Sequence, residues 1–89
     1  MEWSLSLSGQ AEKFLARRHL SDDFARDPVE RAIKKLLGET VTVDMRKTSG
    51  KWEGYYRVRV GKLRIIFSAD FETQTAYIEV IDNRGSAYR

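Results

Sequence analysis

Between residues 55 and 67 hydrophobic and polar side chains alternate with a period of two, the period of a β-strand. The pattern predicts two strands, 55–60 and 63–67, joined by the turn Gly61-Lys62, with Gly where a positive φ is needed. This turn sets the register, so that Arg59 faces Arg64 across the hairpin. One face is then mainly apolar: Tyr56, Val58, Val60, Leu63, Ile65 and Phe67. The other face carries Tyr55, Arg57, Arg59, Arg64 and Ile66.

The first 20 residues predict a strand and then a helix. Trp3, Leu5 and Leu7 alternate with polar residues, as in a half-buried strand that lies beside the later sheet. From Ser8 onward the period becomes helical, with apolar residues at Ala11, Phe14 and Leu15 and with Ser8 or Gly9 placed to cap the helix.

A second helix is predicted from Asp27 as N-cap and Pro28 as first helical residue to about Leu37, with Gly38 as its stop. Its apolar stripe is Val29, Ala32, Ile33, Leu36 and Leu37. Residues 40–46 alternate as an edge strand would, whereas 46–50 have the composition of a loop. The pattern therefore does not decide whether residues 40–46 form a strand. A turn at 70–73 precedes a last strand, whose inward residues are expected to be Ala76, Ile78 and Val80.

The order of these elements predicts an α+β fold. We expect an N-terminal strand and two helices packed on one face of a three- to four-stranded antiparallel sheet, with residues 1–89 forming a single domain. Because the apolar parity of the hairpin must meet the helices, the arginine parity is left on the open face of the sheet. Two arginines opposed on that face repel each other, so this face favours an anion.

Charge is concentrated on the same hairpin. Residues 51–67 contain five basic residues against Glu53 alone, a net charge of +4 compared with +3 for the whole chain, which points to a polyanionic partner. There is no apolar run of membrane-spanning length and no signal-peptide pattern, so we expect a cytoplasmic protein without a membrane partner. With no Cys and one His, we expect no metal and no cofactor.

The residues quoted so far resemble the RelE/ParE superfamily of toxins from type II toxin–antitoxin systems. The resemblance spans nearly the whole chain. Its carriers are the strand Trp3-Ser-Leu-Ser-Leu, the first helix with Ala11 and Leu15, the run from Gly54 to Phe67, and the ending Ile81-Asp-Asn-Arg-Gly-Ser-Ala-Tyr88. Basic residues on alternate positions before Gly61, followed by Arg64, are fairly specific for that family, and Arg84 with Tyr88 four positions later is its usual finish.

This resemblance implies a RelE-like fold and a metal-independent endoribonuclease that cuts mRNA in the ribosomal A site and is silenced by a cognate antitoxin. The candidate catalytic residues carried over are Arg57, Arg59, Arg64, Arg84 and Tyr88. Guanidinium groups suit the charge that builds on phosphorus, but they are protonated at ordinary pH and cannot act as the base. Tyr88 can stack on a base or relay a proton. Many ribosome-dependent relatives have His where Asn83 stands, so no residue is an obvious general base.

Other interpretations of these residues remain open. The arginine face is also compatible with a solvated sheet face paired with Glu79 and other acids, and Tyr88 with an exposed terminal residue. Trp52 suits either base stacking or a gap beneath a loop. Besides mRNA cleavage, the fold class admits a ParE-like inhibitor of DNA gyrase and an inactive module that only binds RNA or an antitoxin.

Overall fold

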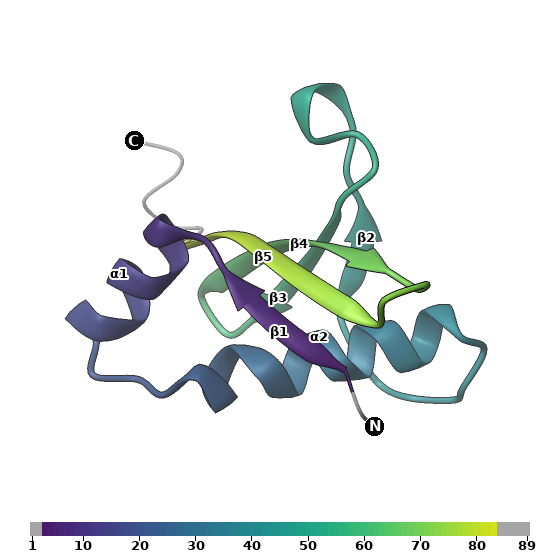
Figure 1. Cartoon of the computed structure of the whole chain (residues 1–89), viewed down its shortest axis with the longest axis horizontal. Coiled ribbons are helices and arrows are strands. Elements are labelled where there is room, and N and C mark those ends of the chain that lie inside the picture. The colour runs from purple at the N-terminus through teal and green to yellow at the C-terminus, as the bar shows by residue number, and fades with distance from the viewer. Residues whose placement is uncertain (1–2, 84–89) are drawn as a thin grey trace.

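The structure is a computed structural model that describes residues 3–83 (Figure 1). Along the chain the elements are β1 (Ser4–Leu7), α1 (Gly9–Arg17), α2 (Asp22–Leu36), β2 (Met45–Lys47), a 3₁₀ turn (Gly50–Trp52), β3 (Tyr56–Val60), β4 (Leu63–Asp70) and β5 (Thr75–Asn83). Within residues 3–83, none of the helices is both long enough and apolar enough to cross a membrane.

The five strands form one sheet in the order β1-β5-β4-β3-β2. The pairs β2–β3, β3–β4 and β4–β5 are antiparallel, and β1 lies parallel to β5 at the edge of the sheet. Both helices lie on one side, and the loop between β2 and β3 rises from the other (Figure 1). The α+β class is therefore confirmed, with β1 and four antiparallel strands. The core between helices and sheet includes Leu15, Val29, Ile33, Ile65, Phe67, Ile78 and Ile81.

The hairpin of β3 and β4 has the predicted register. Val60 pairs with Leu63, Arg59 with Arg64 and Tyr56 with Phe67. Gly61 has φ 59°, the left-handed conformation that the two-residue turn requires. Val58, Ile65 and Phe67 are buried on the helix side, so the face that carries Arg57 and Arg64 is the open face, as expected.

Helix α2 begins six residues earlier than predicted, since Ser21, not Asp27, is its N-cap and Pro28 lies inside it. Pro28 has no N–H to donate to the carbonyl of Phe24 and crowds that carbonyl. The additional segment contains Phe24, which packs against the core, and Ala25, which is fully buried four residues before Val29. Asp22 and Asp23 also lie in the first turn, where carboxylates favour the helix dipole. These contacts offset the proline, a balance that the local sequence does not reveal.

The edge strand left open by the sequence exists but lies later than its alternation suggested. β2 pairs Met45 with Val58, Arg46 with Arg57 and Lys47 with Tyr56. Residues 40–44 are outside it, and Arg46 and Lys47, expected in a loop, belong to it. The reason is the partner strand: the Asp44 carbonyl still accepts from the Arg59 N–H at 3.0 Å, but β3 ends at Val60, so in this register the residues before Val43 have no strand opposite them.

One extra residue in β5 changes its inward side chains. Phe67 pairs with Ile78 and Ile66 with Val80, so Glu79 has no partner on β4 and forms a β-bulge. Ala76 and Ile78 are buried as predicted, but the next core residue is Ile81, with no exposed surface, instead of Val80. Beyond the bulge, Val80 and Asp82 therefore share the open face with Ile66 and Arg64, with which they pair.

The position of Pro28 inside α2 leads to a prediction about stability. Replacing Pro28 by Ala restores the missing N–H and removes the clash with the carbonyl of Phe24. We expect the free energy of unfolding to rise by about 1–3 kcal/mol, less than the full helix penalty because Pro also restricts the unfolded chain. Urea denaturation measures this change. Arg31→Ala, at an exposed position of the same helix, is the control and should stay within about 0.5 kcal/mol of the native protein. An unchanged or lower stability of Pro28→Ala would contradict this account of the helix.

Candidate nucleic-acid interface

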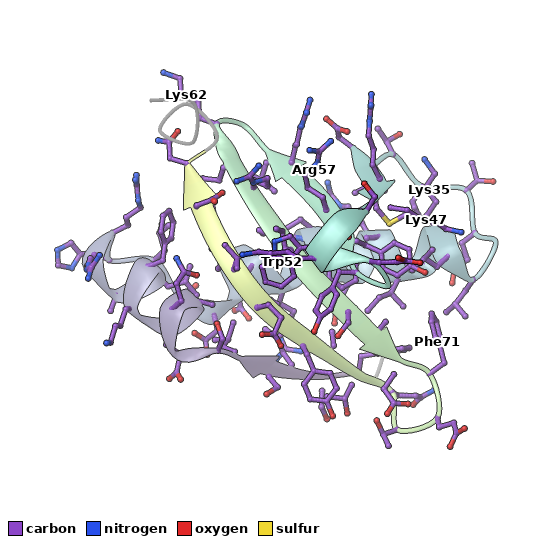
Figure 2. All side chains as sticks on the ribbon, turned by 90° about the horizontal axis from the view of Figure 1, so that it is seen from above. Lys35, Lys47, Trp52, Arg57, Lys62 and Phe71 are labelled. Atoms are coloured by element: carbon purple, nitrogen blue, oxygen red, sulfur yellow. The ribbon has the colours of Figure 1, made fainter. Side chains whose placement is uncertain are left out.

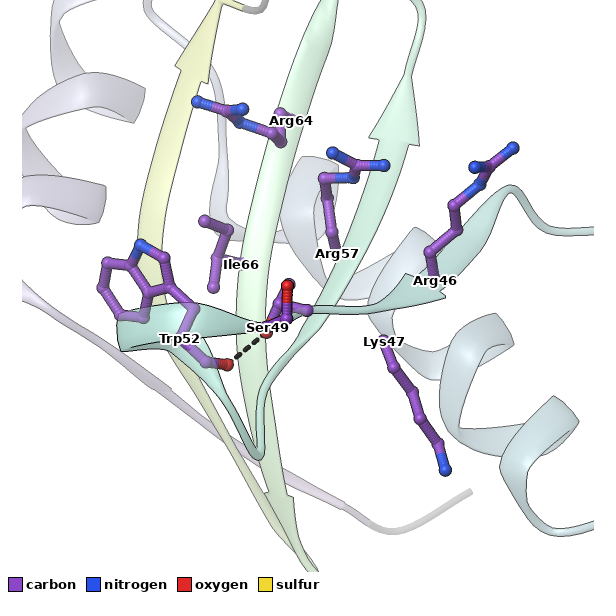
Figure 3. Close-up of a pocket in the computed structure, with 8 residues that line it drawn as sticks. Arg46, Lys47, Ser49, Trp52, Arg57, Arg64 and Ile66 are labelled. Atoms are coloured by element: carbon purple, nitrogen blue, oxygen red, sulfur yellow. Dashed lines mark hydrogen bonds between the residues drawn. The ribbon is translucent and has the colours of Figure 1, made fainter.

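A concavity of about 390 Å³ lies on the open face where β2, β3, β4 and the loop between β2 and β3 meet. Its lining is basic, hydroxyl-bearing and in part apolar: Arg46, Lys47, Thr48, Ser49, Trp52, Arg57, Arg64 and Ile66 (Figure 3). The three arginines extend to the same side of the sheet, whereas Lys47 points away from them (Figure 3). The concavity is therefore a surface to which three neighbouring strands each contribute an arginine side chain.

The loop at residues 48–55 folds back over the sheet because Thr48 holds both of its ends. The Thr48 N–H donates to the carbonyl of Tyr55 at 3.1 Å, and its hydroxyl bonds the carbonyl oxygens of Tyr55 and Trp52. The Trp52 ring meets the ring of Tyr55 edge-on, with centroids 5.2 Å apart. Viewed from above, Trp52 lies over the sheet (Figure 2). Trp52 and Ile66 line the same concavity, and Ile66 is only 6% exposed although it belongs to the open face.

The predicted site residues separate into three groups. Arg57 and Arg64 line the basic concavity together. Arg59 pairs with Arg64 in the register but lines a second concavity, of about 400 Å³, beside α2. Arg84 and Tyr88 lie outside the described residues, so their predicted roles stay predictions.

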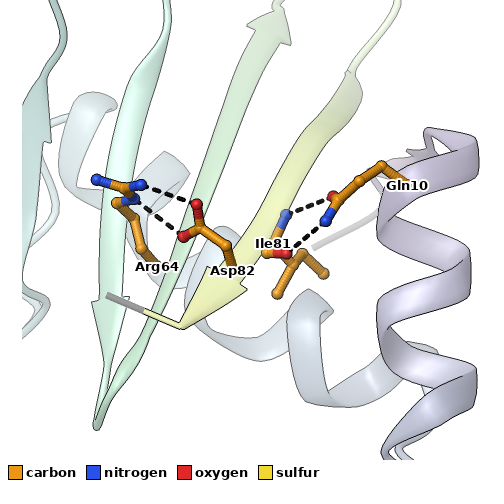
Figure 4. Close-up of polar contacts among 4 residues, drawn as sticks. All are labelled: Gln10, Arg64, Ile81 and Asp82. Carbon is orange, nitrogen blue, oxygen red and sulfur yellow. Dashed lines mark hydrogen bonds and ion pairs between the residues drawn. The ribbon is translucent and has the colours of Figure 1, made fainter. Parts of the chain in front are cut away.

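Arg64 is bound by a carboxylate of the same sheet. Its Nε donates to Asp82 Oδ1 at 3.0 Å and its Nη2 to Asp82 Oδ2 at 2.8 Å, a two-bond fork (Figure 4). The two side chains are 22% and 33% exposed. The anion that the opposed Arg59 and Arg64 require is thus supplied in part by the protein. The acid is Asp82, which the bulge brings opposite Arg64; it is one of the other acids that the alternative interpretation allowed besides Glu79.

Side chains from the start of α1 hold β5 where β1 ends. The Ser8 hydroxyl donates to the carbonyl of the bulged Glu79 at 2.6 Å. The Gln10 amide then bonds the backbone of Ile81 twice: its Nε2 donates to the carbonyl at 2.8 Å, and its Oε1 accepts from the N–H at 2.9 Å (Figure 4). The Gln10 amide thus bonds Ile81 as the backbone of a neighbouring strand would, and it fixes the position of the backbone just before Asp82.

No protein-family model matches this sequence, and no curated protein sequence matches it. Solved structures do match it. A chain of the toxin–antitoxin complex RelBE2 from Mycobacterium tuberculosis superposes with a TM-score of 0.59 at 23% identity, covering 94% of this chain and 100% of that chain. The E. coli DinJ–YafQ complex gives a TM-score of 0.63 at 15% identity, with both chains fully covered. The YoeB–YefM complex from Staphylococcus aureus gives 0.63 at 14% identity over 92% of this chain and 97% of that chain.

The chain has the RelE fold. This confirms the fold that the resemblance in sequence implied, and at these identities the likeness is one of fold.

Two residues of this RelE-like face were missed by the sequence analysis. Arg46 shares the polar parity of Thr42 and Asp44, and extending that alternation by one residue would have placed it beside Arg57. Asp82 carried a signal as well. Strict alternation from Ala76 and Ile78 puts a carboxylate at a core position, which is a sign that the strand contains a bulge.

The chemistry available on this face is phosphate binding. Guanidinium groups offer planar pairs of donors to phosphate oxygens, and Ser49 adds a hydroxyl. Among the lining residues within 3–83, none is His, Asp or Glu, so this part of the lining contains no ordinary proton acceptor. Nor does this part of the chain bring three or more His, Cys, Asp or Glu side chains together as a metal site.

The double contact of Gln10 with Ile81 predicts that Gln10→Ala weakens the end of β5. Loss of two partly buried hydrogen bonds should lower the free energy of unfolding by about 1–3 kcal/mol. The Ile81 N–H should also exchange faster with solvent deuterium, because its acceptor is gone. Denaturation and amide exchange measure the two effects, with Lys13→Ala, exposed on α1, as control. Unchanged exchange at Ile81 would show that Gln10 does not hold the strand.

Proposed function

We propose that this protein is the toxin of a type II toxin–antitoxin pair and that it cleaves mRNA in the ribosomal A site. One observation carries the proposal: the basic concavity with Arg46, Arg57 and Arg64 lies on the open face of a RelE fold. Its electrostatics suit a polyanion, and its half-buried Trp52 offers an aromatic surface next to the arginines, a combination typical of sites that bind single-stranded nucleic acid.

The cleavage we propose is attack of a ribose 2′-OH on the adjacent phosphorus, with the 5′-oxygen as leaving group. The bond from phosphorus to the 2′-oxygen forms as the bond to the 5′-oxygen breaks; the proton of the 2′-OH passes to a base, and the leaving 5′-oxygen takes a proton from an acid. Arginines on the open face stabilise the negative charge on the phosphate oxygens. Since the described lining holds no base, the proton acceptor in this proposal is Tyr88 or a group of the ribosome. Arg84 and Arg59 keep the phosphate-stabilising roles that the resemblance gives them.

The proposed protein partner is a cognate antitoxin. Structures that share the fold were solved as toxin–antitoxin complexes, which supports this class of partner. The second concavity gives such a partner an apolar surface between α2 and β3. It is lined by Phe24, Pro28, Val43 and Val60 together with two arginines and two acids, Arg31, Arg59, Asp27 and Asp44. An amphipathic helix that carries charges of both signs beside its apolar face has the chemistry to dock there.

Cleavage is tested by expressing the protein in cells without an antitoxin and mapping the ends of mRNA. We expect growth arrest with new ends inside translated regions. Arg57→Gln should reduce cleavage by about 10²–10³-fold, the usual effect of removing one donor to a developing oxyanion. Arg17→Gln removes the same charge from an exposed position of α1, away from both concavities, and should leave cleavage near the native level.

The same experiment separates the competing functions. Intact transcripts during growth arrest would contradict the proposal. DNA breaks that depend on gyrase, with intact mRNA, would select the gyrase inhibitor, a function for which the lack of a base in the described lining leaves room. Normal growth of cells that contain the folded protein would indicate a module that only binds.

A further inference from the structure

Two arginines of the open face stand directly opposite each other on neighbouring strands. Arg46 of β2 pairs with Arg57 of β3 in the antiparallel register, so both side chains leave the sheet on the same face. Figure 3 shows them side by side at the basic concavity. Directly opposed residues have Cβ atoms about 4.5–5.5 Å apart, and like charges at that position destabilise a sheet. The protein thus keeps a repulsive pair at the edge of its sheet.

Within residues 3–83 neither Arg46 nor Arg57 has an ion pair, since the pairs formed there involve Arg26 and Arg64. Arg64 differs from both, because Asp82 occupies its Nε and Nη2 donors. Its guanidinium also turns toward β5, away from Arg57 (Figure 3). The uncompensated positive charge of the concavity therefore lies at Arg46 and Arg57, between β2 and β3, and not at Arg64.

The surroundings of this pair suit one tetrahedral anion. Ser49 lines the same concavity and is exposed, so its hydroxyl is available as a further donor. A phosphate between the two strands can accept from one guanidinium on one oxygen and from the other on a second oxygen. Its charge would also relieve the repulsion between the arginines, so that binding gains from a strain already present in the free protein.

We propose that Arg46 and Arg57 bind one backbone phosphate of a single-stranded RNA between them, and that Arg64, held by Asp82, does not bind that phosphate. The choice of RNA rests on the proposed function. The different roles of the arginines rest on three observations: the register that opposes Arg46 and Arg57, the lack of a carboxylate partner for either of them within residues 3–83, and the two hydrogen bonds from Arg64 to Asp82.

The test is the salt dependence of binding to a short single-stranded RNA with 2′-O-methyl groups at every position, which blocks cleavage through the 2′-OH. Arg46→Gln and Arg57→Gln should each weaken binding about tenfold or more. A plot of log K against log salt concentration has a negative slope. The double variant should make this slope less steep by roughly 0.7, the value for one phosphate of a single strand. A change of roughly 1.4 would mean two separate phosphates and would overturn the shared site.

Arg64 is tested with its partner removed at the same time. Arg64→Gln combined with Asp82→Asn keeps the net charge and leaves no unpaired carboxylate, so we expect an affinity within about twofold of the native protein and an unchanged slope. A loss of RNA affinity as large as that of Arg46→Gln would mean that Arg64 does bind the phosphate, and it would overturn the proposal. Arg17→Gln, at an exposed position of α1, is the matched control for loss of one positive charge outside the site, and it should follow the native slope.

Arg46→Glu gives an independent readout. It places an opposite charge across from Arg57, so RNA binding should be lost while the melting temperature equals or exceeds the native value. Retained RNA affinity would overturn the proposal. Loss of affinity with a lower melting temperature would count against it too, because it would assign Arg46 to the fold.

These measurements are separate from the test of the proposed function, since they need neither ribosomes nor cleavage. If cells show no mRNA cleavage while the RNA slopes follow the expectation, the phosphate site stands and the toxin activity fails. If mRNA is cleaved but the Arg46 variants bind RNA like the native protein, only the phosphate site fails.

Discussion

The extra residue in β5 determines which side chains the last strand presents to the core and which to the open face. With Glu79 bulged out of the ladder, Ile81 enters the core and Asp82 comes to lie opposite Arg64. A strand without the bulge would bury the carboxylate of Asp82 in an apolar core, which is costly without a partner. The bulge is held from α1, through the Ser8 hydroxyl on Glu79 and the Gln10 amide on Ile81. The start of α1 thus controls the electrostatics of the opposite face.

Charge on the open face is divided as a result. Arginines oppose each other twice across this sheet, at Arg59 with Arg64 and at Arg46 with Arg57. Asp82 compensates the first pair through Arg64, whereas no carboxylate within residues 3–83 pairs with the second. The sheet therefore has a compensated side toward β5 and an uncompensated side toward β2. An incoming anion gains more from the uncompensated side, because there it does not have to compete with a bound carboxylate.

What could be predicted from the sequence was set locally. The register of β3 and β4 followed from the turn at Gly61, and the open face followed from that register. The errors arose where distant contacts decide. Asp27 and Pro28 are a good helix start, yet α2 extends beyond them because Phe24 and Ala25 find a core to pack against. The position of β2 depends on where β3 ends, and Arg46 entered the site only with it. Asp82 depends on a bulge that α1 stabilises. The fold was thus predictable, whereas the contributions of Arg46 and Asp82 to the charge of the open face were not.

The parallel pairing of β1 with β5 also constrains how the protein is made. β5 is the last described strand in the chain, but it lies between β1 and β4 in the sheet. The hydrogen bond from Ser8 to Glu79 joins residues 71 positions apart. Contacts of such sequence separation form late, because the loop-closure entropy must first be overcome. On the ribosome, β1 and α1 emerge long before their partner strand exists. Until β5 has left the exit tunnel, β1 has no strand to pair with and Arg64 has no Asp82, so the sheet and its charge pattern are completed together once β5 has emerged.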